Sequence, residues 1–190
     1  MSDYPFFTPY DEILFNSRVV HVSGPVGSEL ADKINQRLLA LEIQDSKKPI
    51  YLYINSPGGE IISGFSIYDT VRFIKPTVYT IVAGMAASMG SIISLSAKKE
   101  NRLAFPNAMI LIHQPLISGR IVGSASDIEI HAKDILKTKE KINQLYSKET
   151  GRSIDQIKKA TDRDNWMTAE EALDFGLLAK IIKSHDELPK

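Results

Sequence analysis

The order of hydrophobic and polar positions predicts that strands and helices alternate between residues 18 and 112. Apolar and polar residues alternate over 18–23, as in a strand, and a helical stripe of apolar residues follows over 28–45. The further predicted elements are strands at 50–54 and 78–83, helices at 61–74 and about 86–97, and strands near 102–105 and 109–112. The 50–54 run is mostly apolar, which favours a strand covered on both faces. This alternation indicates an α/β fold with a mostly parallel sheet.

One long helix is predicted to dominate the C-terminal third, over 124–149. At about 26 residues it would be roughly 39 Å long, more than a compact domain of this size needs. We therefore expect it to project and to pack against another copy of the chain. Thr168 and Glu171 have capping-box spacing before a short helix that Gly176 can end, and 177–182 is predicted to be the last strand.

Composition and charge narrow the class of protein. The chain has 190 residues, the length of one domain, and 43% of them are hydrophobic. Its 23 basic and 23 acidic residues give no net charge, so no overall field attracts nucleic acid or repels a second copy. The absence of cysteine excludes thiol catalysis, Cys-ligated zinc and disulfides.

An uncharged stretch at 76–97 is long enough to span a bilayer. Its first part is β-branched and aromatic, which favours a strand, and its second part is rich in Ala, Ser, Met and Gly, which favours a packed helix. We therefore expect two elements joined at Gly84 and no membrane partner. The N-terminus carries Asp3 where a signal peptide needs a base, so a cytoplasmic location is expected.

Ser88 is the first candidate for chemistry, because it lies in the segment 84–90, where the predicted strand is followed by a helix. A nucleophile there is close to the positive end of the helix and to a free backbone N–H. The segment differs from the Gly-x-Ser-x-Gly elbow, since Ala86 stands where that motif has glycine. The same spacing also fits a small-residue helix packed against the sheet.

Two further candidates follow predicted strands. The segment 55–59 has two glycines at the carboxyl end of a parallel strand, where backbone N–H groups can turn toward a ligand, although a plain sharp turn fits equally. His113 follows the strand at 109–112 and is either a catalytic base or a hydrogen-bonded core residue. No pair of histidines has metal-ligand spacing, so we expect no metal site.

A catalytic base needs an acid that fixes its tautomer, and Asp164 in the polar segment 162–166 is a candidate. A solvated loop explains this segment equally well. Periodicity alone does not select Asp164 over Asp162, Asp127 or Asp155.

Taken together, these motifs resemble the ClpP family, the proteolytic subunits of ATP-dependent Clp proteases. The matching segments lie in the family's order between about 18 and 182, namely 51–59, 84–90, 113–115, 127–132 and 162–164. The resemblance implies a ClpP/crotonase-type ββα superhelix with a projecting handle. In this scheme 1–17 is a short axial segment, 18–190 is a single catalytic domain, and the handle region is at about 114–150.

The resemblance also implies a serine endopeptidase that hydrolyses unfolded polypeptides to short peptides. Ser88 would be the nucleophile, His113 the general base and Asp164 its orienting acid. The N–H groups of Gly59 and Met89 would form the oxyanion hole. No cofactor or metal is implied for this chain, since ATP is used by a partner ATPase.

Assembly and partners are implied in the same way. The family forms two stacked heptameric rings around a chamber, and Asp162 and Arg163 would pair across the rings. Tyr51, Tyr53 and Phe73 would line outer grooves into which a hexameric ATPase of the ClpX, ClpA or ClpC type inserts apolar loops.

Two segments depart from the family pattern, and three competing functions stay open. The segment 1–16 is short for the axial segment, and 116–123 fits a slightly longer loop, so a mixed assembly with a paralogue stays open.

A crotonase-type acyl-CoA hydratase or isomerase is the first competing function. It would share the fold but use carboxylates. A weakly active or structural ring subunit is the second competing function. A relative of the signal-peptide peptidases, which would need a membrane anchor, is the third.

Overall fold

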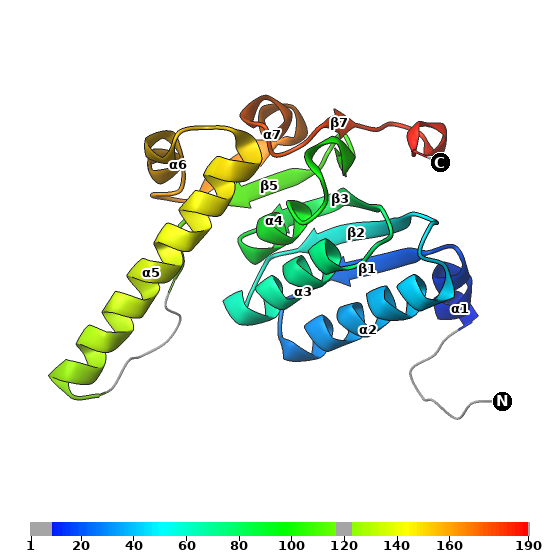
Figure 1. The fold of residues 1–190 in the computed structure, drawn as a ribbon. Coiled ribbons are helices and arrows are strands. Elements are labelled where there is room, and N and C mark those ends of the chain that lie inside the picture. The colour runs from blue at the N-terminus through cyan, green and yellow to red at the C-terminus, as the bar shows by residue number, and fades with distance from the viewer. Residues whose placement is uncertain (1–8, 117–122, 190) are drawn as a thin grey trace.

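A seven-stranded sheet organises the chain, whose computed structural model describes residues 9–116 and 123–189 (Figure 1). The strand order is β1-β2-β3-β4-β7, and β5 pairs with both β3 and β6. The strands are β1 (Val19–Ser23), β2 (Ile50–Ser56), β3 (Val78–Ala87), β4 (Arg102–Ala104), β5 (Met109–Ile112), β6 (Asn165–Thr168) and β7 (Lys180–Ile181). The pairing is parallel except between β5 and β6, so the predicted α/β class with a mostly parallel sheet is confirmed.

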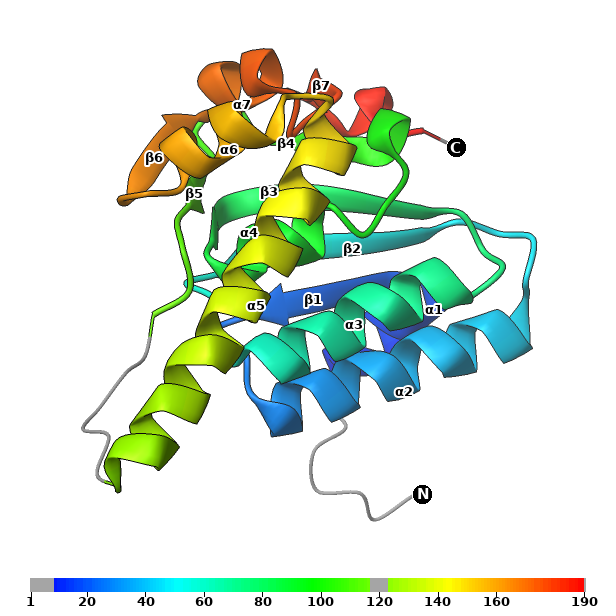
Figure 2. The same cartoon turned by 60° about the vertical axis from the view of Figure 1, so that its left-hand side comes forward.

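Helices cover the sheet, and α2 and α3 lie side by side over one face of it in both ribbon views (Figures 1 and 2). The helices are α1 (Pro9–Asn16), α2 (Ser28–Gln44), α3 (Ile61–Phe73), α4 (Met89–Ser94), α5 (Ala125–Thr150), α6 (Ile154–Ala160) and α7 (Ala169–Phe175), with 3-10 turns η1 (Lys99–Asn101) and η2 (His185–Glu187). Strong apolar periodicity placed α2, α3 and α5 within a residue or two of their predicted ends.

The main core lies between the sheet and these helices. Leu52 and Ile54 of β2 are fully buried there, together with Leu38 of α2. Tyr51 and Tyr53 point to the other face, where they pack only partly against a smaller apolar cluster. The prediction that this strand is covered on both faces therefore holds for one face only.

β3 differs from its prediction. The strand runs over 78–87 rather than 78–83, and the helix after it is limited to 89–94 rather than 86–97. The junction between strand and helix is therefore at Ser88 and not at Gly84, which corrects the sequence-based assignment.

Gly84 marks a bend inside β3 instead of its end. The β2–β3 register shifts there, Gly84 has a φ of 147°, and the side-chain oxygen of Asn55 accepts a 3.2 Å hydrogen bond from the Met85 N–H. Before the bend, residues 80–82 pair with β4, and after it residues 85–87 pair with β5. A glycine inside a strand can mark such an irregularity as readily as a strand end, which explains the error.

Helix α5 projects from the rest of the molecule in both ribbon views (Figure 2). Its first turn has a capping box between Ser124 and Asp127, and Gly151 ends it in the left-handed conformation. Its buried residues are Ile142, Asn143, Tyr146 and Thr150, all in the C-terminal part. The apolar side chains of the N-terminal part are exposed, as in the case of Leu136 at 62%. The helix thus has an apolar surface that one chain does not cover.

Short elements account for the other differences. The capping box of Thr168 and Glu171 and the left-handed Gly176 are confirmed, but α1, α6 and β6 were not predicted because they span too few residues for a clear period. The last strand is β7 alone, shorter than the predicted 177–182. Helix α1 packs Phe15 on the main core.

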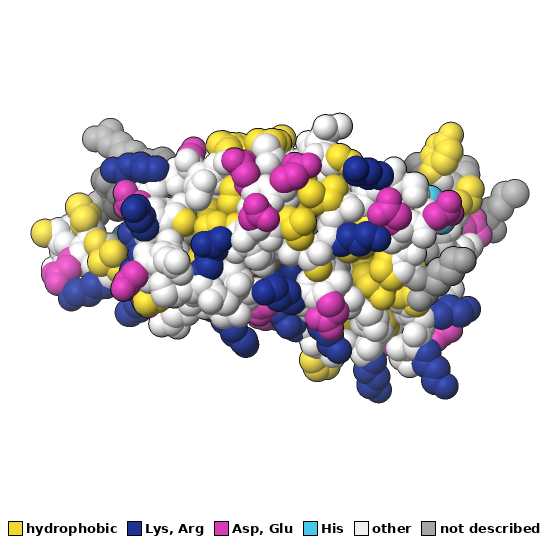
Figure 3. Space-filling model, turned by 90° about the horizontal axis from the view of Figure 1, so that it is seen from above, with side chains coloured by type: hydrophobic (Ala, Val, Ile, Leu, Met, Phe, Trp, Pro, Cys, Tyr) yellow, Lys and Arg dark blue, Asp and Glu magenta, His cyan; other side chains and the backbone are white. Residues whose placement is uncertain are grey.

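The surface and the uncharged stretch also bear on the predicted class. Lys and Arg side chains are mixed with Asp and Glu over the face shown in Figure 3, in keeping with the zero net charge. The segment 76–97 consists mainly of β3 and α4. It is therefore a strand and a helix, as predicted, and not one membrane-spanning helix. Within residues 9–116 and 123–189, no helix is long and apolar enough to cross a membrane.

A buried ion pair fastens the C-terminal end of α5 to the body. Arg102 of β4 is fully buried and binds the carboxylate of Glu149, whose other oxygen accepts a 2.7 Å hydrogen bond from Arg72 of α3. Arg102 also donates to the carbonyl oxygens of Leu95 and Glu149. Burial alone would raise the pKa of Glu149, but hydrogen bonds and charge from the two arginines outweigh it and hold that pKa below its usual value.

Glu149→Gln should therefore destabilise the fold by about 3 kcal/mol at pH 7, because it leaves Arg102 buried without a counter-charge. The ionised carboxylate stabilises the fold above its unfolded pKa, near 4.5, and that contribution is lost as pH falls through the lower folded pKa. Circular dichroism melts at pH 7 and at about pH 4 should show the difference from wild type shrinking at the lower pH.

Glu140→Gln is the matched control, since Glu140 lies on the same helix and pairs with Lys158 at the surface. It should change the melting temperature little at either pH. If both substitutions changed the melting temperature equally, the Arg102–Glu149 ion pair would not be what fastens α5.

Candidate active site

Ser88 occupies a strained turn between β3 and α4. Its φ of 53° and ψ of −119° are rare for a residue with a side chain. Glycines give the turn its space: a Cβ on Gly58 would lie 2.7 Å from the Cβ of Ser88, and one on Gly90 would lie 2.9 Å from the Ser56 carbonyl oxygen. Strain of this kind is found where a nucleophile is exposed at the end of a strand. Position 86 does not require glycine, because Ala86 is still a paired residue of β3.

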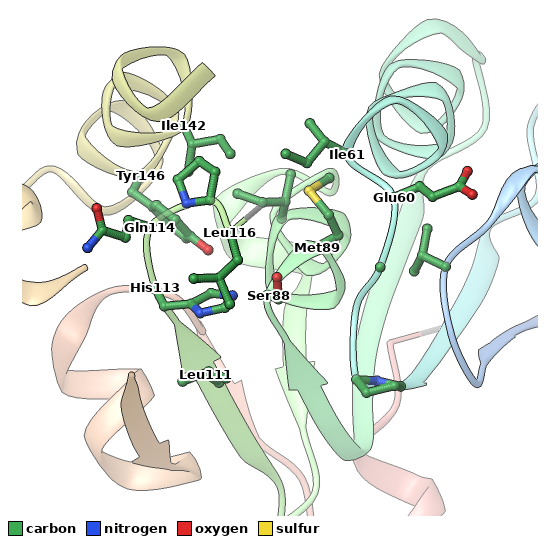
Figure 4. A pocket seen from close by; sticks show the side chains of 15 residues that line it. Glu60, Ile61, Ser88, Met89, Leu111, His113, Gln114, Leu116, Ile142 and Tyr146 are labelled. Carbon is green, nitrogen blue, oxygen red and sulfur yellow. The ribbon is translucent and has the colours of Figure 1, made fainter. Parts of the chain in front are cut away.

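The parallel pairing of β3 with β5 places His113 beside Ser88. The Ser88 N–H donates a 3.0 Å hydrogen bond to the Leu111 carbonyl oxygen, two residues before His113. Figure 4 shows the imidazole and the hydroxyl facing one cavity from the two strand ends. No hydrogen bond joins these two side chains in the part of the chain that the structure describes, and such contacts are often long before substrate binds.

Asp164 meets the other side of the imidazole. Its Oδ1 lies 3.1 Å from the Nδ1 of His113, because the antiparallel pairing of Ile112 with Asn165 brings the preceding loop to this point. With the carboxylate ionised, Nδ1 carries the proton and Nε2 is left as the acceptor that faces the cavity. The His113 side chain is 12% exposed, whereas that of Asp164 is 66% exposed.

Asp162 does not share this position. Its backbone carbonyl oxygen accepts a 2.6 Å hydrogen bond from the side chain of Gln114. The structure thus brings Asp164, and not Asp162, to His113. Periodicity alone could not select between the two carboxylates.

Two backbone N–H groups border the cavity near Ser88. Val26 donates to the Gly58 carbonyl oxygen and accepts from the Glu60 N–H, so in this parallel bridge the N–H of Gly59 points away from Val26. Met89 is the first residue of α4, where N–H groups have no partner within the helix. Gly59 and Met89 both line the cavity that Ser88 borders.

The cavity itself has a volume of about 560 Å³ and is mostly apolar. Ile61, Ile92 and Ile142 contribute to its wall, with Tyr146 from the buried part of α5 (Figure 4). Glu60 and His113 are the ionisable residues besides Tyr146 among the described side chains that line it. Such a cavity fits an apolar side chain of a ligand whose polar main chain lies along the glycine turn.

Comparison with protein families decides the class. The model of the Clp protease family matches residues 6–185. The chain belongs to the Clp protease family. The fold is accordingly of the ClpP/crotonase type, as the resemblance implied, and the protein is a Clp-type peptidase. Members of this family assemble into rings and work with Clp ATPases.

The residues expected to form the ATPase groove are only partly together in one Clp protease chain. Tyr51 and Tyr53 lie on the outer face of the sheet, and the Tyr51 hydroxyl donates a 2.6 Å hydrogen bond to the carbonyl oxygen of Pro189. Phe73 ends α3, which packs on the opposite face, and is 79% exposed. One chain therefore does not bring all three together.

Arg163 is exposed and donates only to the backbone carbonyl oxygen of Asp162 among the described contacts. The longer loop expected at 116–123, which is the part of the expected handle region before α5, falls mainly on residues 117–122, which lie outside the described residues. Residues 1–8 of the expected axial segment 1–17 lie outside them as well. Within the described ranges, no group of three His, Cys, Asp or Glu side chains could hold a metal ion.

Sequence analysis missed the roles of Gln114 and Tyr146. The Gln114 backbone N–H donates to the Thr161 carbonyl oxygen, and its side chain joins Asp162 to Lys139 of α5. Its place in the 113–115 motif was the one signal that pointed to it. Tyr146 falls on the buried stripe of α5, but a helical period does not show that it reaches the cavity.

Asp164→Asn should lower kcat by roughly 10²–10⁴-fold, because an amide cannot stabilise the imidazolium in the same way. Asp162→Asn is the matched control, since it keeps the backbone carbonyl that Gln114 binds. Hydrolysis of a short fluorogenic peptide by intact assemblies of both variants measures the effect. A larger loss from Asp162→Asn than from Asp164→Asn would show that Asp164 is not the orienting acid.

Proposed function

We propose that this Clp-type peptidase is a serine endopeptidase, the proteolytic subunit of an ATP-dependent Clp protease. The observation that carries the proposal is the ordered pair of Asp164 and His113 beside a strained Ser88 in an apolar cavity. The Clp protease family match over residues 6–185 supports it independently.

In this mechanism, Ser88 Oγ attacks the scissile carbonyl carbon while Nε2 of His113 accepts the hydroxyl proton. Asp164 stabilises the imidazolium that forms. The N–H groups of Gly59 and Met89 bind the oxygen as it becomes negative, which is usually a large contribution to catalysis. His113 then protonates the departing amine, and a water molecule activated by the same imidazole releases the acyl group from Ser88.

Unfolded polypeptides are the proposed substrates, and short peptides are the products. The glycine turn at 58–59 and the apolar cavity suit an extended chain, because a folded substrate could not bring its backbone into this cleft. The chain itself needs no cofactor in this scheme, and ATP is consumed by the partner.

Assembly into two stacked heptameric rings is part of the proposal. The exposed apolar side chains of Ile128, Ile130 and Leu136 on α5 favour a partner that covers them, and zero net charge does not oppose it. A hexameric ATPase of the ClpX, ClpA or ClpC type would feed the chamber in the cytoplasm, and a ClpP paralogue would be able to share the rings. Tyr51, Tyr53 and Phe73 would meet in the outer groove through neighbouring subunits.

A crotonase-type function has less support from the cavity. Such an enzyme needs carboxylates for proton transfer, and Glu60 is the acidic side chain among the described residues that line this cavity. It would have no use for the pair of His113 and Asp164.

Ser88→Ala should abolish peptide hydrolysis and labelling by a fluorophosphonate probe while assembly stays intact, because the hydroxyl is the attacking group. Ser23→Ala is the control, since Ser23 is an exposed serine at the end of β1. Undiminished hydrolysis by purified Ser88→Ala, with contaminating protease excluded, would refute the proposal.

Arg163→Ala should shift particles from double toward single rings and reduce activity. An exposed ion pair is typically worth less than about 1 kcal/mol, but the contact would be repeated around the ring. Analytical ultracentrifugation combined with peptide hydrolysis measures both effects. A wild-type chain that stays monomeric at all concentrations and still hydrolyses peptides at full rate would contradict the ring model.

A further inference from the structure

A chain of two hydroxyl groups connects α5 to the turn that carries Ser88. The hydroxyl oxygen of Tyr146 lies 2.6 Å from Oγ of Ser91, and that Oγ lies 2.6 Å from the carbonyl oxygen of Ser88. Tyr146 is 1% exposed and Ser91 is fully buried. Neither residue has a part in the proposed proton transfers.

The direction of both hydrogen bonds follows from the acceptor at the end. A carbonyl oxygen only accepts, so Ser91 must donate its proton to Ser88. Ser91 Oγ is then left as the acceptor for the Tyr146 hydroxyl. Burial raises the pKa of Tyr146 far above its usual value, so the phenol keeps this proton throughout the neutral range.

The Ser88 carbonyl oxygen already accepts hydrogen bonds that do not involve these two hydroxyl groups. It accepts hydrogen bonds from the N–H groups of Ser91 at 3.0 Å and Ile92 at 3.3 Å, as expected at the start of a helix. The hydroxyl chain is therefore not needed to satisfy that oxygen. It adds the Ser91 hydroxyl as a third donor to the same atom, and Tyr146, from an element distant in the sequence, donates in turn to that hydroxyl.

The Ser88 carbonyl and the Met89 N–H belong to one peptide group. Donors that withdraw electron density from the carbonyl oxygen make the N–H of the same group a stronger donor, since hydrogen bonds in a chain polarise one another. In the proposed mechanism this N–H meets the developing oxyanion. The chain from Tyr146 thus ends at a group that acts in the transition state.

We propose that Tyr146 and Ser91 are positioning residues that orient and polarise the Ser88–Met89 peptide group for oxyanion binding. This inference rests on the proposed function, because the oxyanion hole is part of it. It also gives α5 a direct mechanical connection to the active site. The projecting part of the same helix carries the exposed apolar side chains described above.

Tyr146→Phe and Ser91→Ala test the chain from both ends, because each removes only a hydroxyl group. In assemblies confirmed by ultracentrifugation, kcat for a short peptide should fall roughly tenfold with KM unchanged, less than the 10²–10³-fold loss of a direct donor. Affinity for a peptide boronic acid, whose tetrahedral anion mimics the transition state, should fall in parallel with kcat. The double variant should be no worse than Ser91→Ala alone, because Tyr146 reaches the Ser88 carbonyl only through the Ser91 hydroxyl.

Tyr68→Phe is the matched control, since the Tyr68 hydroxyl binds Glu149 away from the cavity. It should leave kcat and boronate affinity unchanged. Unchanged kcat and boronate affinity in both test variants would overturn the inference, as would strictly additive losses in the double variant. If one of the two variants failed to assemble, the kcat and boronate affinity of the other would still test the inference.

The proposed function fails in a different way. A wild-type protein that neither hydrolyses peptides nor reacts with a fluorophosphonate at Ser88 would overturn the serine mechanism and this inference with it. An active, labelled wild type with an unaffected Tyr146→Phe variant would overturn the inference alone.

Discussion

The bend in β3 at Gly84 is the constraint on which the site depends. One strand has to pair first with β4 and then with β5, and a straight strand could not reach both neighbours at these positions. The bend uses a backbone conformation that favours glycine, and the Asn55 side chain secures it by binding the Met85 N–H. Because the second half of β3 lies against β5, Ser88 and His113 emerge at neighbouring strand ends on one side of the sheet.

Close packing around the turn keeps Ser88 in its strained conformation. Gly58 allows the segment after β2 to approach the serine, and Gly90 allows the first turn of α4 to approach the Ser56 carbonyl, more closely than any side chain would permit. Strain at a single residue persists only where its surroundings fix the backbone, and here both neighbours of the turn are buried. Gly59 and Met89, which flank these close contacts, both line the cavity beside Ser88.

One chain leaves two parts of this arrangement unfinished. Asp164 is more than half exposed although it contacts His113, and the projecting part of α5 presents apolar side chains to solvent. Ring assembly, which is characteristic of the family, would cover such surfaces. The C-terminal part of α5 is held firmly by Glu149 between Arg102 and Arg72, and Tyr146 lies one turn earlier on the same helix.

The sequence by itself determined the long elements and their caps. The apolar periods of α2, α3 and α5 and the capping box at Thr168 depend on neighbouring residues, so their physics is local and visible in the sequence. The family motifs likewise identified Ser88, His113 and Asp164 as candidates. Short elements such as β6 were lost because a few residues carry no clear period.

Only the tertiary structure decided which of these residues meet. Asp162 and Asp164 are equivalent in composition and spacing, and the antiparallel register of β5 with β6 brings Asp164 to His113 and leaves Asp162 beside Gln114. The local pattern at Gly84 indicates a strand end, whereas its actual bend depends on two different partner strands. The link from Tyr146 through Ser91 joins residues 55 positions apart, and contacts between distant segments are fixed by packing rather than by any local pattern.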